Sequence, residues 1–141
     1  MNVKNFRNIL LLICIACHIV GCKPDREEKN MGYDLVCFTE YDDDGSSLKG
    51  VKRRTDGKYI GRFDTFTGFK RGFYVGTKYR TTTLYFPHND LLLRSEHVKM
   101  GKHAICLQVG NTWQVMTYDG RVLSKSDVMP PQEEWDIINK D

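Results

Sequence analysis

Motifs that signal catalysis or metal binding are scarce in this chain. It has no Gly-x-Ser-x-Gly nucleophile motif and no glycine-rich phosphate loop, the elements that supply a nucleophile or a phosphate cradle in their enzyme classes. His88, His97 and His103 match no familiar zinc spacing. We therefore expect no enzyme, no cofactor and no metal site, and we interpret these histidines as exposed loop residues.

Long apolar runs are also scarce, and the only marked one lies near the start. Ile9 to Val20 is an uncharged run of 12 residues, whereas a helix that spans a membrane needs roughly 20. Lys4 and Arg7 precede the run, and a basic start followed by a short apolar stretch is typical of a secretory signal. A transmembrane helix is the weaker interpretation.

The apolar run ends in Ile19-Val20-Gly21-Cys22. This segment resembles the lipobox of bacterial lipoproteins, in which an aliphatic residue, a small or aliphatic residue and Gly or Ala precede a cysteine. The resemblance covers the first 22 residues only. It implies cleavage before Cys22 and acylation of that thiol. Cys17, which follows Ile15 and Ala16, is a second candidate lipobox cysteine, and cleavage without acylation or an uncleaved segment would also fit these residues.

The same resemblance implies a location. Two or more acyl chains hold a protein stably on a membrane, and mature lipoproteins of this kind carry two or three. Lys23 follows the cysteine, where Asp would favour retention in the inner membrane, so we expect attachment to the outer membrane, facing the periplasm. We assign residues 1–21 to the signal, the polar residues 22–32 to a flexible tether, and residues 33–141 to one domain.

Cysteine is rare in the mature chain. Beyond Cys22 only Cys37 and Cys106 remain, both in apolar, strand-like surroundings. Two cysteines in an oxidising compartment most simply pair. We predict a Cys37–Cys106 disulfide, with two unpaired core thiols as the alternative.

The mature domain has the composition of an all-β fold. Residues 48–86 are rich in Tyr, Phe, Thr, Val and Gly, and the Asp56-Gly57, Gly110-Asn111 and Asp119-Gly120 pairs are hairpin signals. Residues 91–100 are ambiguous between a strand and a short helix. Residues 130–138 predict a closing helix that turns Trp135 and Ile138 toward the sheet. We see no repeat, and we expect a mainly β, small antiparallel sandwich or barrel with a short C-terminal helix.

Charge is unevenly distributed, although the mature chain is almost neutral. The signal holds two of the 21 basic residues and none of the 18 acidic ones, which leaves a net charge of +1. Residues 33–45 carry five acidic and no basic residues, and residues 49–80 carry ten basic residues against two acidic ones. The acidic run Asp42–Asp44 lacks the spacing of an EF-hand and is interpreted as a solvated turn, with an irregular calcium site as the alternative.

The basic stretch alternates with aromatic residues, a composition that recurs at protein interfaces. We predict that its exposed cations bind an acidic protein partner, and the alternative is a solvated coat over an aromatic core. Nucleic acid is not expected as a partner in this compartment. The residues selected for partner binding are Arg53, Arg54, Lys58, Arg62, Lys70 and Arg71.

A small anchored β domain of this kind favours a binding module. The leading hypothesis is a membrane-anchored lipoprotein that binds a protein in the cell envelope, in general plan similar to small immunity or inhibitor lipoproteins. The alternative is a structural accessory lipoprotein of an envelope secretion, transfer or assembly machine.

Overall fold

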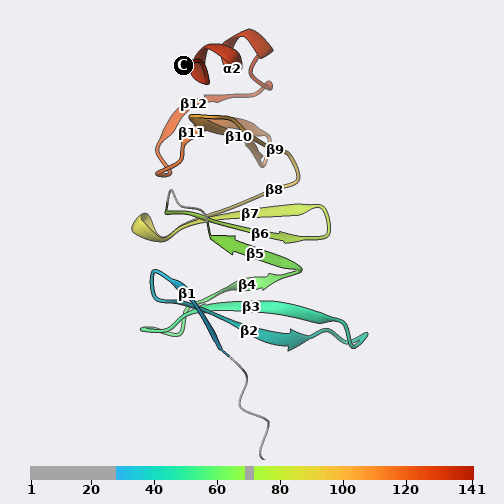
Figure 1. Cartoon of the computed structure of the whole chain (residues 1–141). Helices are drawn as coiled ribbons and strands as arrows, with labels where there is room; N and C mark the ends of the chain where they lie inside the picture. Colours follow the sequence, from blue (N-terminus) through green and yellow to red (C-terminus); the bar gives the residue numbers. More distant parts are fainter. Residues whose placement is uncertain (1–27, 69–71) are drawn as a thin grey trace, which may run out of the picture.

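The computed structural model describes residues 28–68 and 72–141, and these residues form three four-stranded antiparallel sheets and one α-helix (Figure 1). The first sheet contains β1 (Lys29–Gly32), β2 (Leu35–Tyr41), β3 (Ser47–Arg53) and β4 (Tyr59–Phe63). The second contains β5 (Thr65–Gly68), β6 (Tyr74–Lys78), β7 (Thr81–Phe86) and β8 (Leu91–Ser95), with the 3₁₀ turn η1 (Pro87–Asn89) before β8. The third contains β9 (Val98–Met100), β10 (Ala104–Val109), β11 (Thr112–Thr117) and β12 (Val122–Ser126), and α2 (Gln132–Ile138) follows.

Each sheet is a meander in which neighbouring strands are neighbours in sequence. The tight turns fall at the glycine pairs that the sequence indicates: Gly57, Gly110 and Gly120 all have positive φ, a backbone conformation that costs glycine little. The hairpins predicted at these three positions are confirmed as β3–β4, β10–β11 and β11–β12.

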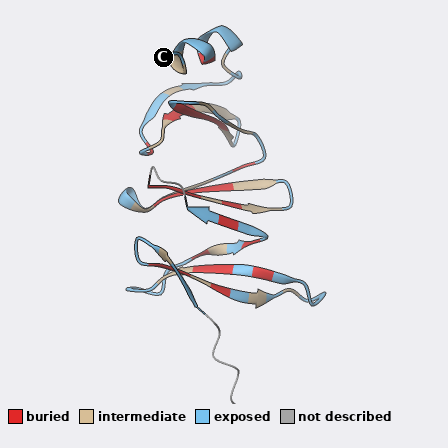
Figure 2. Ribbon diagram, viewed as in Figure 1, coloured by how far each residue is buried: buried red, intermediate tan, exposed pale blue. Residues whose placement is uncertain are grey.

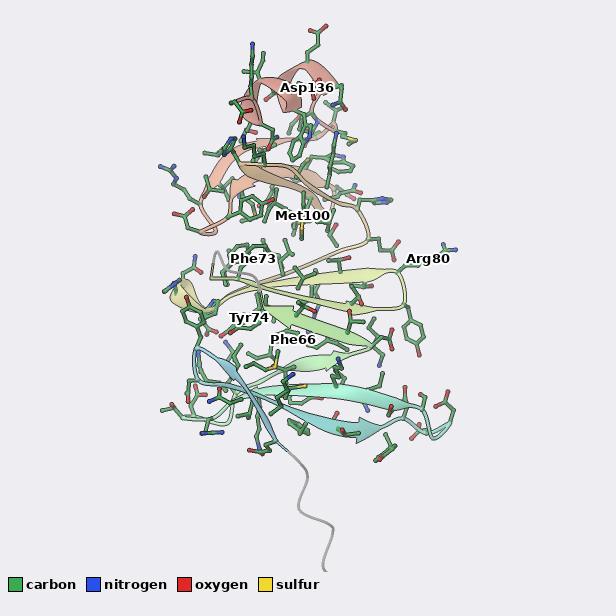
Figure 3. The ribbon with its side chains drawn as sticks, in the orientation of Figure 1. Phe66, Phe73, Tyr74, Arg80, Met100 and Asp136 are labelled. Atoms are coloured by element: carbon green, nitrogen blue, oxygen red, sulfur yellow. The ribbon has the colours of Figure 1, made fainter. Side chains whose placement is uncertain are left out.

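The three sheets stack as layers, and α2 closes one end of the stack (Figures 1 and 2). Alternate residues of each strand face opposite sides, so the middle sheet contributes to two cores. Figure 3 shows Phe66 and Tyr74 on the side of the second sheet that faces the first, and Phe73 on the side that faces the third. The core between the first and second sheets consists of Leu35, Val51, Ile60, Phe63, Phe66, Tyr74 and Tyr85. The core between the second and third consists of Phe73, Leu84, Phe86, Ile105, Leu107 and Met116.

The predicted C-terminal helix is confirmed as α2. Trp135 is 6% exposed and packs with Ala104, Cys106 and Val115 of the third sheet, and Ile138 packs against the same cluster. Glu133 and Glu134 lie in the first turn, where negative charge is favoured by the helix dipole. Asn139 links the end of α2 to the start of β10, because its side-chain oxygen accepts hydrogen bonds from the backbone N–H groups of His103 (2.9 Å) and Ala104 (3.2 Å).

The mainly β class is therefore confirmed, and the structure decides two alternatives that the sequence left open. The sheets form an open stack and are not closed into a barrel. Residues 91–100, ambiguous between a strand and a short helix, contain two strands, β8 and β9. The chain also repeats one architectural unit, a four-stranded meander, although no repeat is evident in its sequence.

The predicted tether ends earlier than expected. Lys29–Gly32 forms β1 and pairs with β2, so these four residues belong to the fold, and residues 22–27 lie outside the described part of the chain. A positive-φ turn at Tyr33 and Asp34 joins the two strands, and β2 starts at Leu35. No helix among the described residues is long and apolar enough to span a membrane.

The predicted Cys37–Cys106 disulfide is wrong, because both cysteines are free. Cys37 lies on β2 in the first sheet, whereas Cys106 lies on β10 in the third sheet, on the face that packs against Trp135. The whole second sheet separates them. Packed sheets lie about 10 Å apart, and a disulfide requires Cα atoms within about 7 Å. Cys106 is buried and Cys37 is half-buried against the core between the first and second sheets, and burial raises the pKa of each thiol.

Candidate functional site

The basic residues selected from the sequence do not converge on one patch. Arg53 and Lys58 flank the β3–β4 turn and are held by carboxylates. The Arg53 guanidinium donates to Asp56 through Nε (2.9 Å) and lies 3.3 Å from Asp90 Oδ1, and Lys58 Nζ contacts Asp90 as well. Tyr85 donates a hydrogen bond of 3.0 Å to the same Asp90 carboxylate. We call Arg53, Asp56, Lys58, Tyr85 and Asp90 the latch, because they tie the first sheet to the second.

The latch has an electrostatic signature. The hydrogen bond from Arg53 holds the pKa of Asp56 well below its ordinary value, and the hydrogen bond from Lys58 lowers the pKa of Asp90. The hydrogen bond to Asp56 likewise raises the pKa of Arg53. Because these cations already have anionic partners within the chain, Arg53 and Lys58 are poorly placed to bind an acidic protein.

The remaining selected residues separate further. Arg54 is exposed, and its backbone N–H donates to the carbonyl of Asp34 (2.8 Å) in the turn next to β1. Lys70 and Arg71 lie outside the described residues, as does Cys22. Arg62 lines a hollow between the first and second sheets, and Arg54 lines a separate hollow beside β1.

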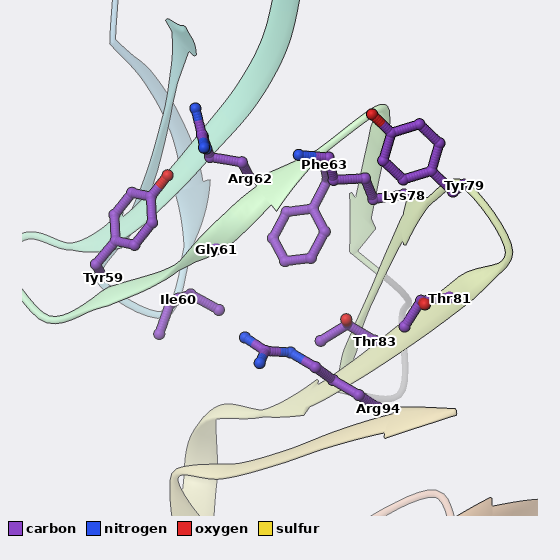
Figure 4. A pocket seen from close by; sticks show the side chains of 10 residues that line it. All are labelled: Tyr59, Ile60, Gly61, Arg62, Phe63, Lys78, Tyr79, Thr81, Thr83 and Arg94. Carbon is purple, nitrogen blue, oxygen red and sulfur yellow. The ribbon is translucent and has the colours of Figure 1, made fainter. Parts of the chain in front are cut away.

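A β-bulge determines which way the side chains of β4 point. Val51 pairs with Gly61, but Lys52 pairs with Tyr59, so Ile60 is the extra residue. Gly61 and Phe63 face away from Arg62, because Phe63 lies in the core. Tyr59, however, lies on the same side of β4 as Arg62 (Figure 4), which simple alternation did not predict.

The hollow beside β4 is a groove of about 420 Å³ between the first and second sheets (Figure 4). We call it the β4 groove. One wall is β4, and the other side is formed by β6, β7, β8 and the β6–β7 turn. Its lining residues are Tyr59, Ile60, Gly61, Arg62, Phe63, Lys78, Tyr79, Thr81, Thr83 and Arg94.

The two sheets are offset at the groove. β3 contacts β5, and β4 contacts β6, with the Phe63 ring resting on Gly76 of β6. The next strands of the second sheet, β7 and β8, pack beneath the first sheet at Tyr85 and Leu92 and extend beyond its edge toward their other ends. Their side chains Thr81, Thr83 and Arg94 form the floor of the groove.

The charge in the groove is positive but partly balanced at its rim. Arg62 Nε lies 3.7 Å from Glu40 Oε2, and Lys78 Nζ lies 3.9 Å from Asp42 Oδ2. Both distances are at the long limit for ion pairs, and exposed pairs contribute little. Within the described part of the chain, no carboxylate forms an ion pair with Arg94. Among these residues the groove thus offers one cation without a counter-ion and two that are weakly held.

A second hollow continues from the first. It has a volume of about 300 Å³, shares Thr81 and Arg94 with the β4 groove, and is lined further by Ser95, Glu96, His97, Gln108 and Gly110. Arg94 therefore lies on the boundary between two hollows on one side of the stack.

Other candidate sites have structural explanations. Asp44 accepts a hydrogen bond of 2.8 Å from the backbone of Ser46, which with the Ser46 hydroxyl lowers its pKa and shapes a solvated turn. His88 packs edge-on against Tyr33, and His97 packs near Trp113. Among residues 28–68 and 72–141, no group of three or more histidine, cysteine or acidic side chains is placed to hold a metal ion.

Most of the groove is not evident from the sequence. Lys78 lies in the basic stretch but is not among the residues selected for partner binding, and Arg94 lies outside that stretch altogether. The one local signal is that Arg94 ends the apolar run Leu91–Leu93, which places a cation on the strand but does not indicate a groove beside it.

Comparisons with known proteins give no relative: no family model, no curated protein and no solved structure matches this chain.

Proposed function

We propose that this chain is a lipid-anchored lipoprotein of the bacterial cell envelope that binds an acidic protein partner through the β4 groove. The observation that carries the proposal is that three cations line one groove beside exposed tyrosines: Lys78 and Arg94 from the second sheet and Arg62 from the outer side of β4. The lipobox at Ile19–Cys22 supports the anchoring. A role as an immunity or inhibitor lipoprotein fits this plan.

The side chains that line the groove favour the binding of acidic residues on a protein partner. Arginine side chains form paired hydrogen bonds with carboxylates, and Tyr59 and Tyr79 supply ring surface at 48% and 84% exposure. Arginine and tyrosine are among the residue types most enriched at interface hot spots. A cationic groove also attracts an acidic partner over a distance and increases its association rate in a salt-dependent manner.

The groove lies near the proposed anchor. β1 starts seven residues after Cys22, and a chain of that length spans at most about 25 Å. The first sheet, and with it the groove, therefore stays close to the membrane surface. A partner bound there is itself close to the membrane.

The test compares two charge-neutralised variants of the full chain. The groove variant carries Arg62→Gln, Lys78→Gln and Arg94→Gln, and the control carries Arg121→Gln, Lys125→Gln and Lys140→Gln at exposed positions of the third sheet and C-terminus. Both variants lose the same charge, and exposed changes of this kind shift stability by less than about 0.5 kcal/mol each. Circular dichroism checks that both are folded.

Each variant is cross-linked in intact cells and purified from membranes. We expect the groove variant to lose a partner that the wild type and the control both retain, by about tenfold, which corresponds to about 1.4 kcal/mol of binding free energy. Equal capture by the two variants, or no partner above background with the wild type, would overturn the proposed function.

A further inference from the structure

The β4 groove runs along a strand edge. β4 is the last strand of the first sheet, and among the described strands its partner in that sheet is β3 alone. All five residues of β4, Tyr59 to Phe63, line the groove. Consecutive residues of a strand point to opposite faces, so a hollow lined by every one of them follows the backbone edge. An edge strand presents N–H and C=O groups that pair with an added strand.

The offset between the sheets leaves space for such a strand. Neighbouring strands in a sheet lie about 4.8 Å apart, and stacked sheets lie about 10 Å apart. Because β4 contacts β6, the next position beyond β4 lies above β7, and its floor is Thr81, Thr83 and Arg94. The groove has the position of a missing fifth strand of the first sheet.

We propose that an extended acidic segment of the partner adds to β4 as this fifth strand. This inference rests on the proposed function and specifies how the partner is held. The backbone of the added segment pairs with the edge of β4, and its side chains alternate. One set faces Lys78, Thr83 and Arg94 on the second sheet, and the other set faces the side of β4 that carries Tyr59 and Arg62. The first set meets two cations, Lys78 and Arg94, and the second set meets Arg62 alone, so the acidic side chains of the added segment belong to the first set.

The edge and the charge together favour this occupant over two others. A second copy of the chain would place its own Arg62, Lys78 and Arg94 beside those of the first, and like charges oppose that pairing. An anionic polysaccharide can contact the cations but has no peptide backbone to continue the ladder of β4. A peptide with carboxylates can pair with the backbone groups of the β4 edge and also bind the cations of the groove.

The direct probe is a synthetic octapeptide of alternating Glu and Thr, capped at both ends and carrying a fluorophore. Its binding to the full chain in detergent is followed by anisotropy. Two further peptides are methylated on alternate backbone nitrogens, one on the even and one on the odd positions. An added strand uses one of its two edges, so we expect one methylated peptide to lose about tenfold or more in affinity and the other to bind like the parent.

Strand addition is overturned if the parent peptide does not bind or if both methylated peptides bind equally. It is also overturned if parent binding survives in the Arg62, Lys78 and Arg94 groove variant. Dimerisation of the free chain through β4, seen by analytical ultracentrifugation and abolished by peptide, would assign the edge to a second copy and also overturn it. If the peptide experiments fail but the groove variant still loses the partner in cells, the proposed function stands and strand addition falls. The two proposals can therefore be distinguished.

Discussion

The Phe63 ring rests directly on Gly76: a Cβ atom added to Gly76 would lie 2.5 Å from Phe63 Cδ1. Gly61 also faces this ring, and a Cβ atom there would lie 2.7 Å from Phe63 Cζ. Two glycines thus let β4 approach β6 with one aromatic ring between them. This contact sets the offset between the first two sheets and, with it, the position of the β4 groove.

Substituting Gly76 by Ala should therefore force the ring out of its place. Overpacking of this kind costs about 1–3 kcal/mol, and urea unfolding measures it. The double variant with Phe63→Leu should recover part of the loss, because the smaller side chain leaves room for the new methyl group. Additive losses in the double variant would contradict a direct contact between the two positions.

The latch predicts a pH dependence of stability. Asp56 and Asp90 have lowered pKa values in the folded state, so they stabilise the fold above the ordinary aspartate pKa of about 3.9. That contribution is lost as pH falls below about 4 toward their folded values. Asp56→Asn should flatten the acid limb of the stability profile, and Asp127→Asn, at an exposed position, should not. Identical acid limbs in the wild type and Asp56→Asn would count against the latch.

The two thiols should be free and slow to react. Mass spectrometry of the unreduced protein should show Cys37 and Cys106 as separate alkylatable peptides after unfolding. Trp135→Ala should expose Cys106 to a thiol reagent in the folded protein while Cys37 keeps its rate, because Trp135 packs in the cluster that holds Cys106. A cross-linked Cys37–Cys106 peptide would contradict the three-layer arrangement.

The lipid anchor is tested by metabolic labelling with a fatty-acid analogue. We expect labelling to disappear in Cys22→Ser and to persist in Cys17→Ser, because the Gly21-Cys22 boundary closes the apolar run. The reverse pattern would move the anchor to Cys17.

Local signals in the sequence were sufficient for the local elements. The glycine turns and the Trp135 helix follow from backbone conformation and residue periodicity, which act over a few residues. The order in which the sheets stack could not be predicted from the sequence. Cys37 and Cys106 have similar apolar neighbours in the sequence, and only the three-dimensional arrangement shows that a whole sheet lies between them. Lys58 and Arg62 likewise look equivalent in sequence, and the spatial position of Asp90 and the bulge at Ile60 distinguish them.

Hydrogen exchange on the full chain, with and without the Glu-Thr octapeptide, tests the central claim most directly. An added strand protects the amides that it pairs with, and β12 serves as an internal control because it is also an edge strand. We predict slower exchange in residues 59–63 on binding and no change in residues 122–126. Unchanged exchange in residues 59–63 with the peptide bound, or equal slowing at both edges, would contradict strand addition at the β4 groove.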